Sequence, residues 1–325
     1  MGKSTGRGKK ALVTGGAGFI GSHLVEALVK EGYRVHVLDN LSTGRLSNLS
    51  SVKNDIVFFE GDIRDGGVLV EAVKNCDVIF HEAAVVSVTQ SVNDPAGTHD
   101  VNTTGTLTVL ESAHRAGVKR VIFASSCAVY GDDPRLPKHE KMVPRPKSPY
   151  AVQKLTGELY ARLYFDLYGI ETVCLRYFNV YGPRQDASSP YSGVISIFIT
   201  RATAGKPATI YGDGGQSRDF VFVKDVVRAN LLAAEAESAG GEVINVATGQ
   251  HIRIKSLWEM VCGQAGIGLV PEYQNPRPGD IIASVGSIDQ AASLLAYRPE
   301  YRFEAGLRET FGWYKEQPPS VGNRV

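Results

Sequence analysis

The chain has 325 residues, of which 43% are hydrophobic and 21% charged, and its formal net charge is +1. This composition is typical of a globular protein with a sizeable core, and the balanced charge gives no electrostatic argument for nucleic acid or membrane partners. No apolar run approaches the roughly 18 residues that a membrane-spanning helix needs. The four cysteines show no CxxC spacing and the seven histidines form no metal motif, so we expect a reduced, cytoplasmic protein without disulfides or metal.

Short apolar segments alternate with longer segments of helical periodicity in the first half of the chain. "KALVTG" predicts a strand, "FIGSHLVEALVKEG" a helix that stops at Gly32, and "RVHVLD" a second strand. Four more strands are expected at "IVFFEGD", "DVIFHEAA", "RVIFASS" and "ETVCLRY", with helices between them. This alternation predicts an α/β fold with a doubly wound parallel sheet that helices cover on both faces. Ligands of such sheets bind beyond the carboxyl ends of the strands.

The rhythm of the sequence changes after about Tyr177. "NVYGPRQDASSPYSG" and "QNPRPGD" are loop-like, and mixed elements surround them, which predicts a smaller mixed α/β domain over the sheet. "DFVFVKDVVRANLLAAEA" predicts a strand and a helix that return to the first domain. We therefore expect a first domain of residues 1–178 with about 220–248, and a substrate domain of residues 179–219 and 249–325.

A glycine-rich segment, "VTGGAGFIGSHL", follows the first strand and opens the first helix. Gly15, Gly18 and Gly21 give GxxGxxG, and Gly16 with the last two also gives GxGxxG. Such glycines allow a tight turn and close approach to a pyrophosphate, which the positive end of the helix attracts. Asp39 closes the second strand, where a carboxylate binds the adenosine ribose and repels a 2′-phosphate. The motif alone could be a plain turn, but its context predicts a Rossmann-type site for NAD in preference to NADP.

Asp62, in "GDIRD", ends the third expected strand and has two interpretations. It could cap the helix after Asp65, since aspartate is a favoured N-cap residue. It could also contact the adenine ring of the dinucleotide, and the two roles are compatible.

Tyr150 and Lys154, in "SPYAVQK", are four residues apart, which places two side chains on one face of a helix. They could be an ordinary exposed pair or a phenol that acts as a base. A free phenol titrates near ~10, so it needs a nearby positive charge to ionise at neutral pH. Isolated YxxxK sequences are common by chance, so the other motifs must decide.

With "TGGAGFIG", Asp39, "SSCAVYG" and "YAVQK" in that order, the chain resembles the extended short-chain dehydrogenase/reductase family from about Lys9 to about Lys315. Within it, "DNLSTG", "FNVYGPRQ", "QSRDFVFVKDV" and "RPGD" resemble the UDP-sugar 4-epimerases of the UDP-glucose/UDP-N-acetylglucosamine type. The resemblance implies an enzyme that uses NAD to invert carbon 4 of UDP-hexoses through a 4-keto intermediate. It implies that the second domain binds the UDP-sugar.

The resemblance also implies roles for the catalytic residues. Tyr150 would be the acid/base, Lys154 would bind the nicotinamide ribose and lower the phenol's pKa, and Ser126 would hydrogen-bond the sugar's 4-hydroxyl. Ser126 could instead be a turn serine at a strand end. Family members commonly continue with further serines, whereas this chain has Cys127 and Ala128, which leaves the fine substrate preference open. No base lies beside Cys127 in the sequence, so we do not expect it to be a nucleophile.

The same resemblance supplies a larger set of binding residues. The expected NAD contacts are Gly15, Gly18, Phe19, Ile20, Gly21, Asp39, Asn40, Ser42, Thr43, Gly44, Asp62, Ile63, Ala83, Ala84, Asn102, Ser125, Tyr150, Lys154 and Tyr177. The expected substrate contacts are Ser87, Ser126, Cys127, Tyr150, Asn179, Gln185, Val194, Arg218, Arg277, Asp280 and Ser284. The two arginines suit a diphosphate, because a guanidinium pairs bidentately with its oxygens.

Some of these residues have simpler interpretations. Ser87 could be a loop cap, and Asn102 and Tyr177 could be buried polar residues with satisfied hydrogen bonds. Ser284 is a small residue at the family's gate position beside carbon 2 of the hexose, where it would leave room for an N-acetyl group. It could equally be a solvated loop residue.

Two other kinds of function stand beside the 4-epimerase: a related nucleotide-sugar enzyme and a non-catalytic NAD-binding sensor. A 4,6-dehydratase normally has Asp-Glu where this chain has Cys127 and Ala128, which counts strongly against it. A uronate 4-epimerase or a decarboxylase needs a pocket for a sugar carboxylate and stays open. A non-catalytic NAD-binding sensor tends to lose the Tyr/Lys pair that this chain keeps. The resemblance further implies a homodimer through the Tyr150 helix and a helix after "SAHRAG".

Overall fold

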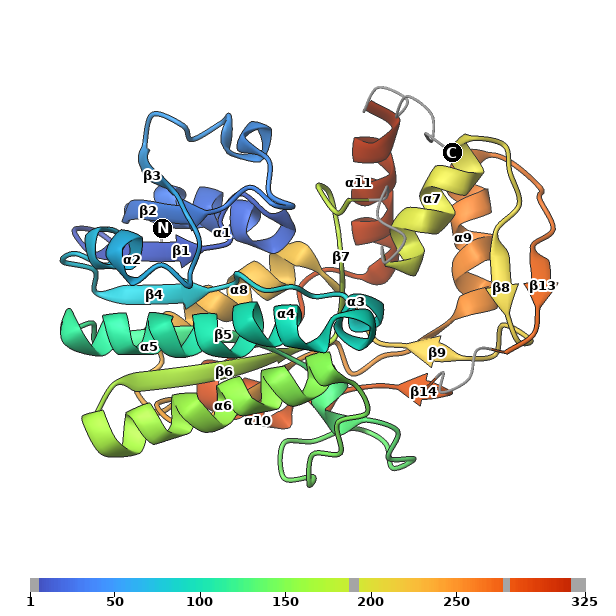
Figure 1. The fold of residues 1–325 in the computed structure, drawn as a ribbon. Coiled ribbons are helices and arrows are strands. Elements are labelled where there is room, and N and C mark those ends of the chain that lie inside the picture. The colour runs from blue at the N-terminus through green and yellow to red at the C-terminus, as the bar shows by residue number, and fades with distance from the viewer. Residues whose placement is uncertain (1–5, 187–192, 277–280, 317–325) are drawn as a thin grey trace.

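A seven-stranded sheet forms the centre of the computed structural model, which describes residues 6–186, 193–276 and 281–316 (Figure 1). The strand order is β11-β6-β5-β4-β1-β2-β3, and every neighbouring pair is parallel. The strands are β1 (Lys10–Thr14), β2 (Arg34–Asp39), β3 (Ile56–Glu60), β4 (Val78–His81), β5 (Arg120–Ser126), β6 (Glu171–Tyr177) and β11 (Val243–Val246). The expected Rossmann-type doubly wound sheet is therefore confirmed. Two of the expected substrate contacts, Arg277 and Asp280, lie outside the described residues.

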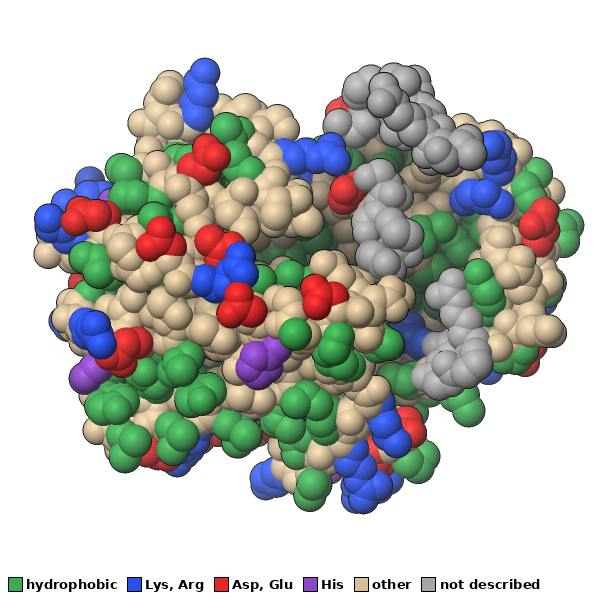
Figure 2. Space-filling model, in the orientation of Figure 1, with side chains coloured by type: hydrophobic (Ala, Val, Ile, Leu, Met, Phe, Trp, Pro, Cys, Tyr) green, Lys and Arg blue, Asp and Glu red, His purple; other side chains and the backbone are tan. Residues whose placement is uncertain are grey.

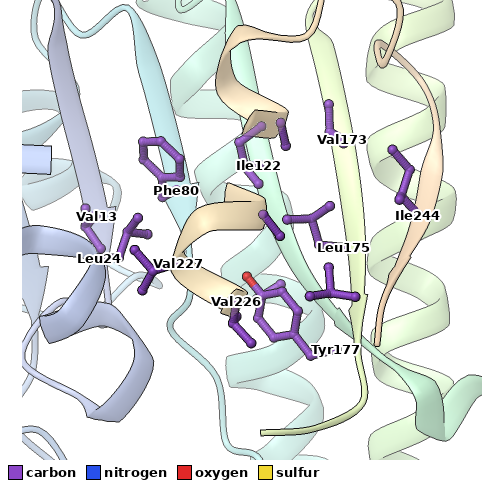
Figure 3. Packing of buried hydrophobic residues seen from close by; sticks show 14 of the residues in the cluster. Val13, Leu24, Phe80, Ile122, Val173, Leu175, Tyr177, Val226, Val227 and Ile244 are labelled. Carbon is purple, nitrogen blue, oxygen red and sulfur yellow. The ribbon is translucent and has the colours of Figure 1, made fainter. Parts of the chain in front are cut away.

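Helices cover both faces of this sheet because successive side chains of a buried strand point to opposite faces. Val13 and Phe80 pack toward α1 and α8, while Leu12 packs with α2 and α5 on the other face (Figure 3). The helices of the first face are α1 (Phe19–Lys30), α8 (Val223–Glu235) and α10 (Asp289–Leu295). Those of the second are α2 (Gly66–Ala72), α5 (Gly105–Arg115) and α6 (Pro149–Tyr168). Short helices α3 (Val88–Asn93) and α4 (Pro95–His99) lead through a π-helical turn (Asp100–Thr104) into α5.

The chain changes direction between β1 and β4, which are neighbours in the sheet although two strands separate them in the sequence. Connections from these two strands leave in opposite directions, which opens a crevice beyond their carboxyl ends. Gly15 and Glu82 follow these two strands directly, and β5 and β6 end at the same edge with Ser126 and Tyr177. The topology thus brings the glycine motif and the "SSCAVYG" motif to one edge.

A second hydrophobic core lies beside the sheet, around Trp258, Phe198 and Tyr181 (right side of Figure 1). Its helices are α7 (Val194–Thr203), α9 (Ile254–Ala265) and α11 (Phe303–Glu316). Small sheets border it, formed by β7 (Asn179–Tyr181) with β10 (Phe220–Phe222), β8 (Thr209–Tyr211) with β13 (Glu272–Gln274), and β9 (Ser217–Arg218) with β12 (Ile252–Arg253) and β14 (Ala283–Ser284).

The segment 220–248 returns to the large sheet through α8 and β11, and α10 packs against both of these elements. The division of the chain into two domains, with boundaries at residues 178, 220 and 248, stays a prediction. In the described part of the chain, no helix has the length and apolar character that crossing a membrane requires.

Candidate active site

The glycine turn between β1 and α1 is shaped for a phosphate. Gly15 has a φ of +68°, and a Cβ there would lie 2.8 Å from the backbone of Ala83. A Cβ on Gly21 would lie 2.2 Å from the Gly15 carbonyl oxygen. No side chain caps α1 at Gly18, so the first-turn N–H groups are available to an anion. The turn therefore fits the pyrophosphate of a dinucleotide.

Asp39 is held in place at the end of β2. Its carboxylate accepts hydrogen bonds from Ala17 N at 2.9 Å and Leu41 N at 2.8 Å, and burial raises its pKa. A Cβ on Gly44 would lie 2.7 Å from the carboxylate, so the loop closes tightly over it. Carboxylate oxygens have further lone pairs, which suit ribose hydroxyls and disfavour a 2′-phosphate.

Asp62 does not cap the following helix. β3 ends at Glu60, and the N-cap of α2 is Asp65, which accepts from Gly67 N at 2.8 Å. Asp62 instead pairs with the Arg64 guanidinium, which holds the pKa of the Asp62 carboxyl well below its usual range. The capping interpretation of Asp62 is therefore wrong, because the helix starts one turn later. A second partner of Asp62 is Asn40, whose Nδ2 donates to it at 2.9 Å.

The remaining expected NAD contacts surround the same edge of the sheet. Asn102 is buried, and its side chain exchanges hydrogen bonds of 2.7 and 2.9 Å with the backbone of Val85 and donates to Gln153 at 2.8 Å. Its amide thus shapes the loop after β4. The other positions are Phe19 and Ile20 in the first turn of α1, Ser42 and Thr43 in the loop after Asp39, Ile63 after β3, Ala83 and Ala84 after β4, and Ser125 within β5.

Local capping places Tyr150 and Lys154 in the first turns of α6. Ser148 is the N-cap and accepts from Ala151 N at 3.2 Å, and Pro149 stands at the first helical position. The Tyr150 N–H donates to Ser91 Oγ at 3.0 Å, which satisfies one of the free donors at the helix start. "SPYAVQK" therefore starts a helix whose first turns bear both side chains.

Ser126, Tyr150 and Lys154 come together at the carboxyl edge of the sheet. Ser126 is the last residue of β5, and its side chain lies close enough to the Tyr150 phenol to lower the pKa of that phenol. Lys154 Nζ donates to the Ala124 carbonyl at 2.7 Å and lies 6.0 Å from the centre of the Tyr150 ring. Tyr150 and Lys154 are only 8% and 3% exposed, which excludes an ordinary surface pair.

The protein's own groups leave the phenol of Tyr150 with a high pKa. Burial raises the pKa of Tyr150 to about 12, and the nearby Ser126 side chain opposes the rise. Burial also lowers the pKa of Lys154 to about 8, against the charges of Glu82 and Glu158. That Lys154 lowers the pKa of the phenol stays a prediction; in this structure the ammonium, which is as deeply buried as the phenol, donates to the Ala124 carbonyl.

Glu82 is a residue of this site that the sequence motifs missed. It follows β4 directly, and its carboxylate accepts from the Tyr177 hydroxyl at 2.7 Å. Burial raises the pKa of Glu82 to about 7, while Tyr177 and Lys154 oppose the rise. The signal for it was an acidic residue immediately after an expected parallel strand, in "HEAA".

Expected substrate contacts gather around β9. Arg218 of β9 is paired with Ser284 of β14, and its Nη1 donates to the Ile281 carbonyl at 2.6 Å. Asn179 Nδ2 donates to the Asp219 carbonyl at 3.1 Å. Burial raises the pKa of the Cys127 thiol to about 12, with opposing influences from the Asp219 and Arg218 charges. The Cys127 thiol therefore stays protonated. The influence of Arg218 and Asp219 on this thiol indicates that β9 lies near the Ser126 end of the site.

The other expected substrate contacts have local structural roles. Ser87 caps α3 by accepting from Gln90 N at 3.0 Å, so the capping interpretation is confirmed. Gln185 Nε2 donates to the Val180 carbonyl at 3.2 Å, while its buried Oε1 has no hydrogen-bond partner among the described residues. Val194 is the first residue of α7. Among the described residues, no group of three or more His, Cys, Asp or Glu side chains could hold a metal ion.

A known protein family matches most of this chain. Residues 11–247 match the family described as "NAD dependent epimerase/dehydratase family". The chain belongs to this family. It is therefore an NAD-dependent enzyme of the epimerase/dehydratase class, as the motifs indicated.

Individual relatives are similar over almost their whole length. A "UDP-glucose 4-epimerase" of Mycolicibacterium smegmatis is 40% identical, over 95% of this chain and 99% of the relative. A "Putative UDP-glucose 4-epimerase" of Methanocaldococcus jannaschii is also 40% identical, over 94% and 98%. A solved "UDP-N-acetylglucosamine 4-epimerase" of Methanobrevibacter ruminantium M1, in complex with UDP-N-acetylmuramic acid, is 41% identical with a TM-score of 0.92, over 96% and 100%.

Proposed function

We propose that this enzyme inverts carbon 4 of UDP-hexoses through a 4-keto intermediate. It would interconvert UDP-glucose with UDP-galactose, and UDP-N-acetylglucosamine with UDP-N-acetylgalactosamine. The observation that carries the proposal is the meeting of Ser126, Tyr150 and Lys154 at the carboxyl edge of the sheet, beside the glycine turn.

Each residue has one task in this reaction. NAD, which the glycine turn and Asp39 would hold, would supply the acceptor and donor of the carbon 4 hydride. Tyr150 takes the proton of the 4-hydroxyl and later gives it back, while Ser126, whose side chain lies near the phenol, orients that hydroxyl. Because burial keeps the phenol protonated to high pH, the positive charges of Lys154 and of the oxidised nicotinamide must favour the phenolate. Holding the sugar in near-attack geometry supplies much of the rate.

The diphosphate would be bound by the second domain. Arg218 supplies a guanidinium, Asn179 is hydrogen-bonded to the carbonyl of the next residue, Asp219, and Arg277 is expected to supply a second guanidinium. Gln185 has a buried side-chain oxygen without a partner in the described part of the chain, and a Cβ on Gly193, at the start of α7, would lie 2.9 Å from its Nε2. No side chain of the described residues caps α7, which suits its N-terminus to the nucleotide.

The pairing of β14 with β9 supports Ser284 as the gate beside carbon 2. Ser284 lies opposite Arg218 in a parallel pair, so the two side chains point to the same face. Its neighbour Ala283 lies opposite Ser217 and points to the other face. Ser284 is 8% exposed, which argues against a solvated loop residue. A small residue here leaves room for an N-acetyl group, and a spare cavity rejects the smaller sugar only weakly.

We also propose a homodimer, which would form through α6. Val152, Leu159, Leu163 and Leu167 are 48%, 60%, 49% and 67% exposed. Their spacing places them on one face of α6, and Figure 2 shows hydrophobic side chains gathered at this side of the molecule. Such a stripe is typical of a helix that packs on a second copy. The expected helix after "SAHRAG" is not there, because that segment ends α5 and leads into β5.

Product analysis tests the proposed activity. Purified protein is incubated separately with UDP-glucose, UDP-N-acetylglucosamine and UDP-glucuronate, and the products are separated and identified by the NMR signals of their sugars. We expect the 4-epimer of the first two sugars. Conversion of UDP-glucuronate alone, or release of its carboxylate as CO₂, would overturn the proposed substrate range.

A further inference from the structure

Glu82 lies level with the anchor of Lys154. His81 of β4 is paired with Phe123 of β5, so the next residues in register are Glu82 and Ala124. The Ala124 carbonyl is the group that accepts the hydrogen bond of Lys154 Nζ, at 2.7 Å. The ammonium and the Glu82 backbone therefore lie at the same height along the carboxyl edge of the sheet.

The two charged groups reach this edge from opposite faces. Lys154 comes from α6 and lies 5.0 Å from the centre of the Phe123 ring, on the face that α6 covers. Glu82 is two residues after Phe80, whose side chain belongs to the core under α1 and α8. Tyr177, which donates to Glu82, lies in the same core beside Val226 of α8 (Figure 3).

Other titratable groups around Lys154 are already neutralised or uncharged. Glu158, one helical turn further along α6, forms a buried ion pair with Arg176 of β6 at 2.7 Å. His81 of β4 stays neutral because burial lowers its pKa to about 3. Among the described residues, the Tyr177 hydroxyl is the one group that donates a hydrogen bond to the Glu82 side chain. Tyr177 in turn accepts from Asn230 Nδ2 of α8 at 2.7 Å, which fixes its hydroxyl toward Glu82.

We propose that Glu82 is the counter-ion of Lys154, a positioning residue that keeps the ammonium charged and fixed at the carboxyl edge, with Tyr177 and Asn230 holding its carboxylate. This inference rests on the proposed roles of Tyr150 and Lys154. Without the carboxylate, a buried ammonium loses its proton more easily, since desolvation disfavours the charged form and an opposite charge favours it. The charge of Glu82 therefore sets the upper pH limit at which Lys154 can assist the phenol.

Direct titration of Lys154 tests this inference without turnover. Protein labelled with ¹³C at the lysine ε-carbons is titrated by NMR, and the Lys154 signal is assigned by its loss in Lys154→Arg. In Glu82→Gln, which keeps an acceptor for Tyr177, we expect the Lys154 titration to move to lower pH by about one pH unit. Tyr177→Phe should move it in the same direction, because it removes the bond that favours the ionised Glu82. The matched control is Glu60→Gln, an exposed carboxylate at the end of β3, which should leave the titration unchanged.

These variants distinguish Glu82 from Glu158 as the counter-ion of Lys154. A Lys154 titration that is unchanged in both Glu82→Gln and Tyr177→Phe, or that moves only in Glu158→Gln, would overturn the assignment to Glu82. The downward shift in Glu82→Gln, with the alkaline limb of the turnover profile moving the same way, supports it. Absence of sugar conversion by the wild type would contradict the proposed function but would leave the titration interpretable.

Discussion

Tyr150 must work as a base although the protein's own environment keeps it protonated. Burial raises its pKa to about 12, and Ser126 is the protein group that lowers it. The phenol is therefore an effective base only when positive charge is close to it, which couples proton removal to the presence of the oxidised cofactor. Burial of the same kind makes Lys154 sensitive to the acidic groups around it.

Replacing Tyr150 tests its assignment as the acid/base. Tyr150→Phe keeps the ring and its packing but removes the hydroxyl, so turnover should fall by ~100-fold or more. NAD should stay bound, because the glycine turn and Asp39 are untouched. Steady-state kinetics and the cofactor content of the purified variant are the measurements. Near-normal epimerisation by Tyr150→Phe would show that another group moves the proton.

Cofactor choice depends on Asp39. Asp39→Ala removes the carboxylate expected to bind the ribose, so NAD affinity should fall by ~10-fold or more, since hydrogen bonds to charged groups contribute about 1.5–3 kcal/mol. Tolerance of a 2′-phosphate should increase. Titration calorimetry with NAD and NADP measures both effects. Asp39→Asn is the milder control, because it removes the charge but keeps an acceptor oxygen for one of the two N–H groups, of Ala17 or Leu41, that donate to Asp39. NADP found in purified wild-type protein would contradict this assignment.

At the scale of elements, the sequence predicted the strands of the large sheet up to β6 and the position of α6. These elements follow from local signals: near-continuous apolar runs, glycines at the turns and Ser148-Pro149 at the start of the helix. The pairing of β14 with β9 could not be predicted in this way, because it joins short segments far apart in the chain. Glu82 was missed for a similar reason, since its partners Tyr177 and Asn230 come from β6 and α8.

Ser284, in the β14 strand that pairs with β9, is predicted to be the gate beside carbon 2 of the sugar. Ser284→Tyr places a ring on the face that bears Arg218, so it should block UDP-N-acetylglucosamine by steric overlap and leave UDP-glucose turnover largely intact. Ser284→Ala is the control that should retain both activities. The measurement is kcat/KM for both sugars in each variant. Equal loss of both activities in Ser284→Tyr, or a wild type unable to epimerise UDP-N-acetylglucosamine, would show that Ser284 is not the gate.

At the scale of the whole molecule, Asp219 links the two cores. Its carboxylate is fully buried and accepts from Thr248 N at 2.9 Å, Gly249 N at 3.0 Å and Gly286 N at 3.2 Å. These donors follow β11 of the large sheet and β14 of the small one. One carboxylate thus fixes the segments that bear Arg218 and Ser284 relative to the sheet that bears the catalytic residues.

The proposed homodimer can be tested by placing a charge in the exposed apolar stripe of α6. Leu163→Glu puts a charge in the exposed apolar stripe of α6, so it should shift the protein from dimer to monomer in sedimentation velocity. The position is 49% exposed, so folding should be unaffected. Val270→Glu, at a residue that is 78% exposed in a loop away from α6, is the matched control and should leave the dimer intact. A wild-type protein that sediments as a monomer would contradict the dimer.

Carbon 4 of the sugar is proposed to be oxidised and reduced within one active site. Isotope exchange tests this mechanism most directly. Purified protein is incubated with UDP-galactose in D₂O, and the equilibrated sugars are analysed by NMR and mass spectrometry. We expect UDP-glucose that carries the original hydrogen at carbon 4, because the hydride would leave and return within the active site while only the hydroxyl proton passes through Tyr150. Deuterium at carbon 4 or carbon 5 of the product, or no conversion at all, would contradict the proposed oxidation and reduction of carbon 4.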